Sequence, residues 1–73
     1  MKLHELMHVI APIENVLIVD QIGREISDYG AAGALRHSRR YERLREHNVL
    51  CVSAADEAGR GQYIEVVIDF AEG

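Results

Sequence analysis

A run of four apolar residues, V-L-I-V at positions 16–19, stands between Asn15 and Asp20. In an extended chain, successive side chains point to opposite faces, so this run is apolar on both faces. Such a strand must be covered on both sides. The pattern therefore predicts that Asn15–Asp20 is the central strand of a small sheet and that the rest of the chain covers or flanks it.

Three further segments have strand character. Arg24–Tyr29 follows a turn at 21–23 and is mostly polar, which is typical of an edge strand. Val49–Ala54 reads V-L-C-V-S-A and predicts a third strand. Gln62–Phe70 alternates with period two, and we expect one of its faces to point into the core. That face consists of Ile64, Val66, Ile68 and Phe70.

Two segments have helical character. Lys2–Ala11 places apolar residues at i, i+3, i+4 and i+7, and Pro12 ends this segment. The apolar stripe consists of Leu3, Leu6, Met7 and Ile10. Residues 31–47 predict a second helix that is broken near Ser38, a candidate N-cap, and restarts through Tyr41–Arg45.

The expected element order is α-β-β-α-β-β within a single domain that spans residues 1–73. Two antiparallel hairpins, each preceded by a helix, predict an α+β fold. We expect a four-stranded, mainly antiparallel sheet with helices on one face. The predicted core consists of Val16, Ile18, Ile64, Val66 and Ile68, together with Leu3, Leu6 and Ile10.

The chain has 73 residues, and a domain of this size buries only about 60% of its unfolded surface. Pairing into a homodimer would therefore add stability. Cys51 is the single cysteine, which favours a reducing, cytoplasmic location. We expect this thiol to be buried and inert. The segment M-K-L-H-E-L lacks the apolar core of a signal peptide, and no run predicts a membrane span or a membrane partner.

The net charge is −4, but it is unevenly distributed. Residues 36–47 contain five basic and two acidic residues, a balance of +3, so the rest of the chain carries −7. We expect one basic patch on an acidic body. Its candidate partner-binding residues are Arg36, Arg39, Arg40, Tyr41 and Arg43.

Two kinds of partner suit that basic segment. Arginines with a tyrosine are typical of protein interfaces, and we favour this interpretation. The alternative is a nucleic-acid-binding or regulatory module in which arginines hold phosphates and Tyr41 stacks on a base. The acidic remainder of the chain argues against general affinity for nucleic acid.

The acidic residues are a further candidate surface. Glu65 and Asp69 fall on the outer face of the last predicted strand, while Asp20, Glu25 and Asp28 belong to the first predicted hairpin. Carboxylates along a sheet can imitate phosphate spacing for a partner that binds nucleic acid. Ordinary solubilising charge explains the same residues more simply.

His4 and His8 form a literal H-E-x-x-H motif with Glu5 between them. In zinc enzymes of this type, the two histidines bind the metal and the glutamate acts as general base. Here both histidines fall off the apolar stripe, and no third ligand is apparent, so they are weak metal candidates and we expect solvent-facing side chains. No Ser–His–Asp pattern or phosphate loop is present. We therefore expect no enzymatic activity and no cofactor.

Four strings of the sequence resemble short proteins of phages and mobile elements. The strings are L-x-x-L-M-x-x-I, V-L-I-V-D-x-x-G, N-V-L-C-V-S-A and the final I-E-V-V-I. Some phage proteins of this size inhibit host defence, anti-CRISPR proteins among them. The resemblance implies a small non-catalytic protein that binds and blocks a host protein.

Overall fold

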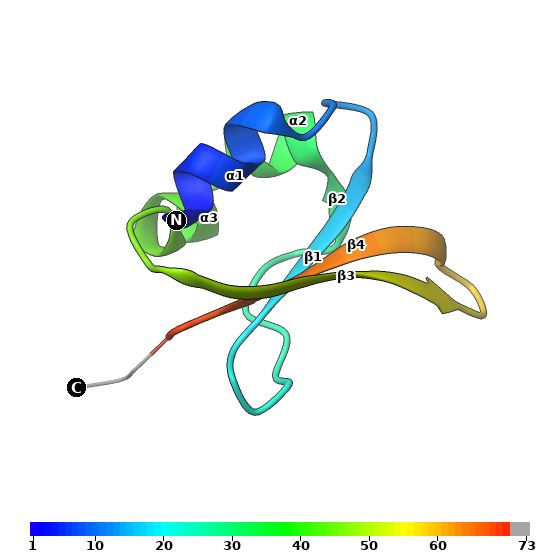
Figure 1. The fold of residues 1–73 in the computed structure, drawn as a ribbon. Coiled ribbons are helices and arrows are strands. Elements are labelled where there is room, and N and C mark those ends of the chain that lie inside the picture. The colour runs from blue at the N-terminus through cyan, green and yellow to red at the C-terminus, as the bar shows by residue number, and fades with distance from the viewer. Residues whose placement is uncertain (71–73) are drawn as a thin grey trace.

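The computed structural model describes residues 1–70, in which short helices lie on one face of a four-stranded sheet (Figure 1). The helices are α1 (Leu3–Val9), α2 (Ala32–Leu35) and α3 (Arg39–Leu44). The strands are β1 (Asn15–Val19), β2 (Gly30–Ala31), β3 (Val49–Glu57) and β4 (Gly61–Ile68). The predicted α+β class is confirmed, with the element order α-β-β-α-α-β-β.

The strands lie in the order β2-β1-β4-β3, so β4, the last strand in sequence, lies inside the sheet. β1 pairs with β4 in parallel, with Val16 opposite Ile64 and Ile18 opposite Val66. The other two pairings are antiparallel. The sheet is therefore mixed but mostly antiparallel. The predicted hairpin of Asn15–Asp20 with Arg24–Tyr29 was wrong as a regular hairpin, because Arg24–Tyr29 forms only an isolated bridge with β1. The predicted second hairpin is present as β3 and β4.

β1 is the central strand that the apolar run predicted. Val16 and Ile18 face the helices, while Leu17 and Val19 face the opposite side of the sheet. On that second side they pack with Tyr63 in a smaller cluster. Both faces of β1 are therefore covered, which explains why its four apolar residues follow one another without a polar position.

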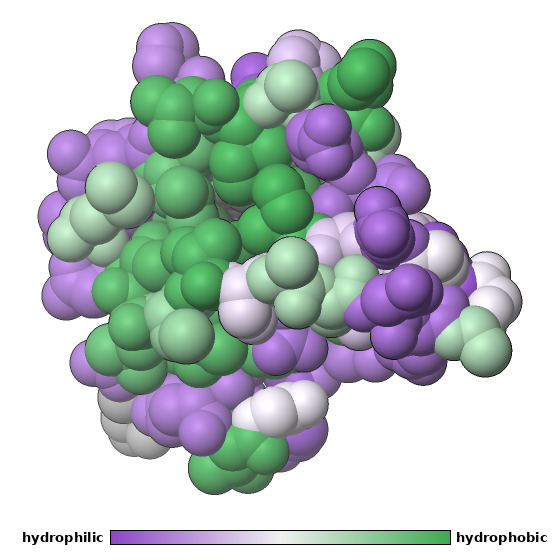
Figure 2. Space-filling model, turned by 45° about the vertical axis from the view of Figure 1, so that its right-hand side comes forward, coloured by the Kyte–Doolittle hydropathy of each residue, from purple (hydrophilic) through white to green (hydrophobic). Residues whose placement is uncertain are grey.

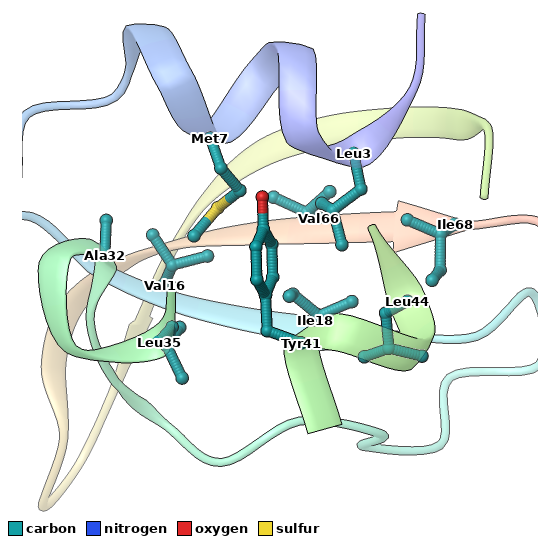
Figure 3. Close-up of a cluster of buried hydrophobic side chains, with 10 residues drawn as sticks. All are labelled: Leu3, Met7, Val16, Ile18, Ala32, Leu35, Tyr41, Leu44, Val66 and Ile68. Atoms are coloured by element: carbon teal, nitrogen blue, oxygen red, sulfur yellow. The ribbon is translucent and has the colours of Figure 1, made fainter. Parts of the chain in front are cut away.

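The main core lies between the helices and the sheet (Figure 3). Of the eight residues predicted for it, five are buried: Leu3, Val16, Ile18, Val66 and Ile68. The other three, Leu6, Ile10 and Ile64, are half-buried at its margin. α1 is turned so that Met7, together with Leu3, points into the core, and the side of the helix that carries Leu6 is left at the edge.

The helical region breaks where Ser38 predicted it would. The Ser38 hydroxyl accepts a hydrogen bond from the backbone N–H of Tyr41 at 3.1 Å, which caps the first turn of α3. α2 and α3 each bury one face, α2 through Ala32 and Leu35, and α3 through Tyr41 and Leu44.

The predicted strand over Arg24–Tyr29 is not a regular strand. Glu25 forms an isolated bridge with Val19, and the N–H of Ile26 donates to the Ile18 carbonyl at 3.0 Å. At the next position the Ser27 hydroxyl accepts a hydrogen bond from the Ile18 N–H, and so takes the place of the main-chain carbonyl that a regular strand would supply. Regular pairing with β1 resumes only in β2, at Gly30–Ala31.

β3 is longer than predicted and forms one edge of the sheet. It continues to Glu57, because Ala55, Asp56 and Glu57 still pair with β4. The helices pack over β1 and β4, whereas most of β3 is exposed. The prediction of a buried thiol was therefore wrong, since Cys51 lies exposed on this uncovered strand.

Candidate functional site

The five arginines of the basic segment point to different parts of the surface. The Arg36 guanidinium donates to the Ile10 carbonyl at 2.7 Å, at the end of α1. Arg40 pairs with Asp28 at 3.3 Å, and Arg45 lies 4.0 Å from Glu42. Arg39 and Arg43 are exposed. Arg39, Arg40 and Arg43 belong to α3, whereas Arg36 and Arg45 lie outside it, so the charges are dispersed and partly paired.

Tyr41, the predicted aromatic contact, lies in the core. Its side chain is 6% exposed, and its ring points from α3 towards α1, with the hydroxyl group between Leu3 and Met7 (Figure 3). Burial raises the pKa of this hydroxyl. The ring cannot stack on a base or serve as an interface anchor without leaving the core, so Tyr41 is a structural residue in this fold.

A hollow of about 500 Å³ brings the weak metal candidates next to part of the basic segment. It is lined by His4, Glu5, His8, Arg36, Tyr41, Glu42 and Arg45. Two arginines and two glutamates among these residues cancel in charge. Arg36 Nε is buried without a hydrogen-bond partner in the described part of the chain. The hollow therefore has little net charge, and its lining does not favour one class of ligand over another.

The H-E-x-x-H residues do not assemble a zinc site in the described residues. His4 Nε2 lies 3.7 Å from Glu46, and His8 is exposed. Glu5 accepts the backbone N–H of Lys2 at 2.8 Å, and this hydrogen bond lowers the pKa of its carboxyl group. A lowered pKa makes the carboxylate a poorer base. Within residues 1–70, no group of three or more His, Cys, Asp or Glu side chains could hold a metal ion.

A second hollow, of about 280 Å³, contains Arg40 and Arg43. Glu25 faces the same space, and Ile26, Leu44 and Phe70 supply apolar walls. The two arginines are thus next to a carboxylate, which offsets part of their attraction for a phosphate.

The acidic candidates are also dispersed. Asp69 is exposed, and its backbone carbonyl lies 2.8 Å from His47 Nδ1, while Glu65 is half-buried on the outer face of β4. Asp20 is only 3% exposed and accepts the backbone N–H groups of Ile22 and Arg24. Asp20 therefore stabilises the turn after β1, and its buried carboxylate does not contribute to an exposed acidic surface.

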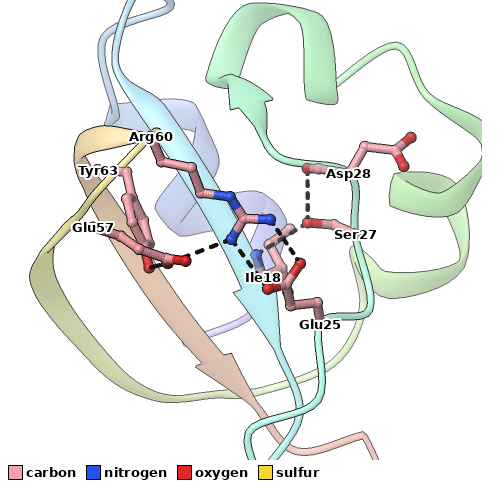
Figure 4. A network of polar contacts seen from close by, with 7 residues as sticks. All are labelled: Ile18, Glu25, Ser27, Asp28, Glu57, Arg60 and Tyr63. Carbon is pink, nitrogen blue, oxygen red and sulfur yellow. Dashed lines mark hydrogen bonds and ion pairs between the residues drawn. The ribbon is translucent and has the colours of Figure 1, made fainter.

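Glu25 is held by Arg60 from the β3–β4 loop (Figure 4). Arg60 donates to both carboxylate oxygens, at 3.0 and 3.1 Å, and its guanidinium lies 5.1 Å from the centre of the Tyr29 ring. The hydrogen bond from Arg60 lowers the pKa of Glu25. This bidentate pair fastens the irregular 24–29 segment across the sheet, so its charges are structural.

Several large apolar side chains are exposed, and sequence reasoning missed them. Val9 and Ile13, at and beyond the end of α1, are 74% and 84% exposed, and Leu50 and Val52 of β3 are 56% and 46% exposed. Val52 lies opposite the buried Val66, which places it on the helix side of the sheet. We call these four residues the α1–β3 face.

Figure 2 shows hydrophobic residues gathered into one broad area of this view, with hydrophilic residues around it. The half-buried residues Leu6, Ile10 and Ile64 pack against the main core. The sequence did contain a signal, because Val9 falls outside the apolar stripe and V-L-C-V has no polar position on either face. Only the V-L-C-V run entered the sequence prediction, as a strand with a buried thiol.

No helix in residues 1–70 combines the length and apolar character that crossing a membrane requires. No protein-family model, curated protein or solved structure matches this chain.

Proposed function

We propose that this protein is a non-catalytic module that binds another protein through the α1–β3 face. One observation supports this proposal above the others: four large apolar side chains, from α1, the segment after it and β3, are each at least 46% exposed. Contiguous apolar surface on a small folded domain is a mark of an interaction site.

The chemistry of this face suits a protein partner. Val9, Ile13, Leu50 and Val52 provide neither hydrogen bonds for bases nor charge for phosphates. Apolar burial is the main favourable term in protein association, at roughly 25 cal/mol per Å² of apolar surface removed from water. The charged side chains of Arg36, Glu42 and Arg45 lie next to His4 and His8, where they can form part of a polar rim.

The resemblance to short phage proteins narrows the class of partner. It implies that the partner is a host defence protein and that binding blocks it, as anti-CRISPR proteins do. In this proposal the face takes the place of the basic segment as the main contact surface.

The test compares three glutamine substitutions. Val9→Gln and Val52→Gln alter the two halves of the face, and Ile22→Gln is the control, because Ile22 is 76% exposed in the turn after β1. The partner is first captured from host lysate, purified and measured against each variant by calorimetry. We expect both face variants to weaken binding by at least about tenfold, as interface anchors do, and the control to bind as the parent does.

Nucleic acid is the competing ligand in this experiment. Binding to single- and double-stranded DNA and RNA is measured at low and physiological salt, since phosphate contacts lose affinity steeply with salt, with a slope of about −0.9 per phosphate neutralised. Sub-micromolar binding that persists at physiological salt and disappears in an Arg36/Arg40/Arg43→Glu variant would overturn the proposal. Equal binding of a purified partner to all three glutamine variants would overturn it as well.

A further inference from the structure

We propose that two copies of this chain pair through β3, antiparallel and across a two-fold axis near Ser53, so that their sheets join edge to edge. This inference goes beyond the proposed function and needs no host partner. It rests on the outer edge of β3 and on the distribution of charge along it.

The outer edge of β3 is open along most of its length. β3 pairs with β4 on its inner side from Val49 to Glu57. On the outer side, the Met1 carbonyl accepts the Val49 N–H at 2.8 Å, and Lys2 bridges Asn48. Among residues 1–70 no other segment pairs with this side. Unpaired main-chain groups in a row are a template for another strand.

This edge also lacks the features that keep edge strands apart. Natural edges are protected by short length, lysine, proline or charged side chains. The opposite edge of the sheet, β2, has only two residues. β3 has nine and carries no charge, lysine or proline from Val49 to Ala55. Its apolar residues Leu50 and Val52 are about half exposed.

The charges favour a second copy in the antiparallel direction. β3 ends in the acidic pair Asp56 and Glu57, while Lys2 lies beside Asn48 at its start. A two-fold axis at Ser53 places residue 53 + k opposite residue 53 − k of the other copy. Cys51 then pairs with Ala55 of the other copy, and Glu57 reaches past the paired residues towards the Met1–Lys2 segment that occupies the outer side of the other copy's Val49. A parallel arrangement would instead bring the acidic ends together, which is unfavourable.

The two-fold arrangement has a geometric consequence for the apolar surface. In a continuous sheet the axis runs perpendicular to the sheet, so both helix layers lie on the same side. Val52 of one copy comes opposite Ala54 of the other, and both positions face the helix side. The pairing thus buries part of Val52 and joins the two α1–β3 faces into one surface. An isologous contact of this kind closes at two copies.

The experiment introduces charged side chains at the two-fold axis. Ser53 is exposed and lies opposite itself in this arrangement, so Ser53→Lys and Ser53→Glu each place two like charges together. We expect the parent to show a concentration-dependent monomer–dimer equilibrium by sedimentation velocity in the presence of a reductant. Each variant alone should dissociate at least about tenfold more readily, whereas an equimolar mixture of the two should form heterodimers. Ile22→Lys serves as the control and should dimerise as the parent does.

Several outcomes would overturn the inference. These are a parent that stays monomeric up to the highest soluble concentration, a dimer that reductant abolishes, a dimer that both Ser53 variants retain, or open-ended growth beyond two copies. Far-UV circular dichroism and thermal melting verify that each variant is folded. A monomeric parent would still leave partner binding through Val9 intact, so the two proposals fail separately.

Discussion

The Ser27 hydroxyl accepts a hydrogen bond from the backbone N–H of Ile18 at 3.0 Å, at a point where a sheet ordinarily uses a main-chain carbonyl. Ser27 is 5% exposed and in turn donates to the Asp28 carbonyl. Ser27→Ala leaves the Ile18 N–H buried without a partner, so we expect the free energy of unfolding to fall by about 1–3 kcal/mol. Urea denaturation measures this change. Ser53→Ala, at an exposed position, is the control, and equal losses in both variants would contradict the role of this hydrogen bond.

Ile18 tests the assignment of the central strand. Its side chain is fully buried between the helices and the sheet. Ile18→Ala removes buried methyl and methylene groups and leaves a cavity, at a cost of about 2–5 kcal/mol. In a marginally stable domain, this loss is enough to unfold much of the population at 37 °C. Ile22→Ala should change the melting temperature little. A parent-like melting curve for Ile18→Ala would contradict the assignment.

Tyr41 separates a structural role from a binding role. Because the ring fills the core between α3 and α1, we expect Tyr41→Ala to destabilise the fold by about 3–5 kcal/mol. Tyr41→Phe keeps the ring and removes only the hydroxyl group, so it should unfold nearly as the parent does and bind a partner with unchanged affinity. Thermal melting and calorimetry measure the two effects. A stable Tyr41→Ala protein that has lost only its binding would return Tyr41 to the contact surface.

Asp20 makes the stability depend on pH. Burial by itself raises the pKa of this carboxyl group, but the hydrogen bonds from the Arg24 backbone and side chain and from the Ile22 backbone outweigh it, so the pKa is lowered in the folded state. A lowered pKa stabilises the fold above the ordinary pKa of an aspartate, and this contribution is lost as the pH falls through the folded value.

Asp20→Asn should therefore reduce stability at neutral pH and flatten its decline in acid. Denaturant midpoints measured between neutral pH and strong acid give both quantities. Glu14→Gln is the control, because Glu14 is exposed and its side chain forms no hydrogen bond within residues 1–70. An acid profile for Asp20→Asn that is parallel to that of the parent would show that other carboxylates control the decline.

Local patterns predicted much of the fold because their causes are local. Four apolar residues in a row required a strand covered on both faces, and β1 is that strand. Ser38 has the side chain of an N-cap, and α3 begins directly after it. The turn at 21–23 has Gly23 at a φ of 88°, a conformation that glycine adopts readily.

The remaining errors concern tertiary contacts, namely which strands pair and which side chains are buried. Parallel pairing of β1 with β4 depends on residues from opposite ends of the chain, and no local pattern encodes it. The 24–29 segment has strand composition, but Ser27 pairs through its side chain. Tyr41 was placed on the surface because arginines flank it, although its ring packs in the core. The exposed α1–β3 face was missed because apolar residues were assumed to be covered.

The position of β4 constrains when the chain can fold. β1 and β3 do not pair with each other, and both depend on β4, which lies between them in the sheet and follows both in the sequence. Until Gly61–Ile68 leaves the ribosome, the segments that become β1 and β3 lack the strand with which both of them pair. The main core, which needs Val66 and Ile68, is incomplete in every shorter nascent chain. Folding of these elements is therefore expected to wait until β4 has left the ribosome and then to occur in one step, with their apolar segments exposed to chaperones and proteases until then.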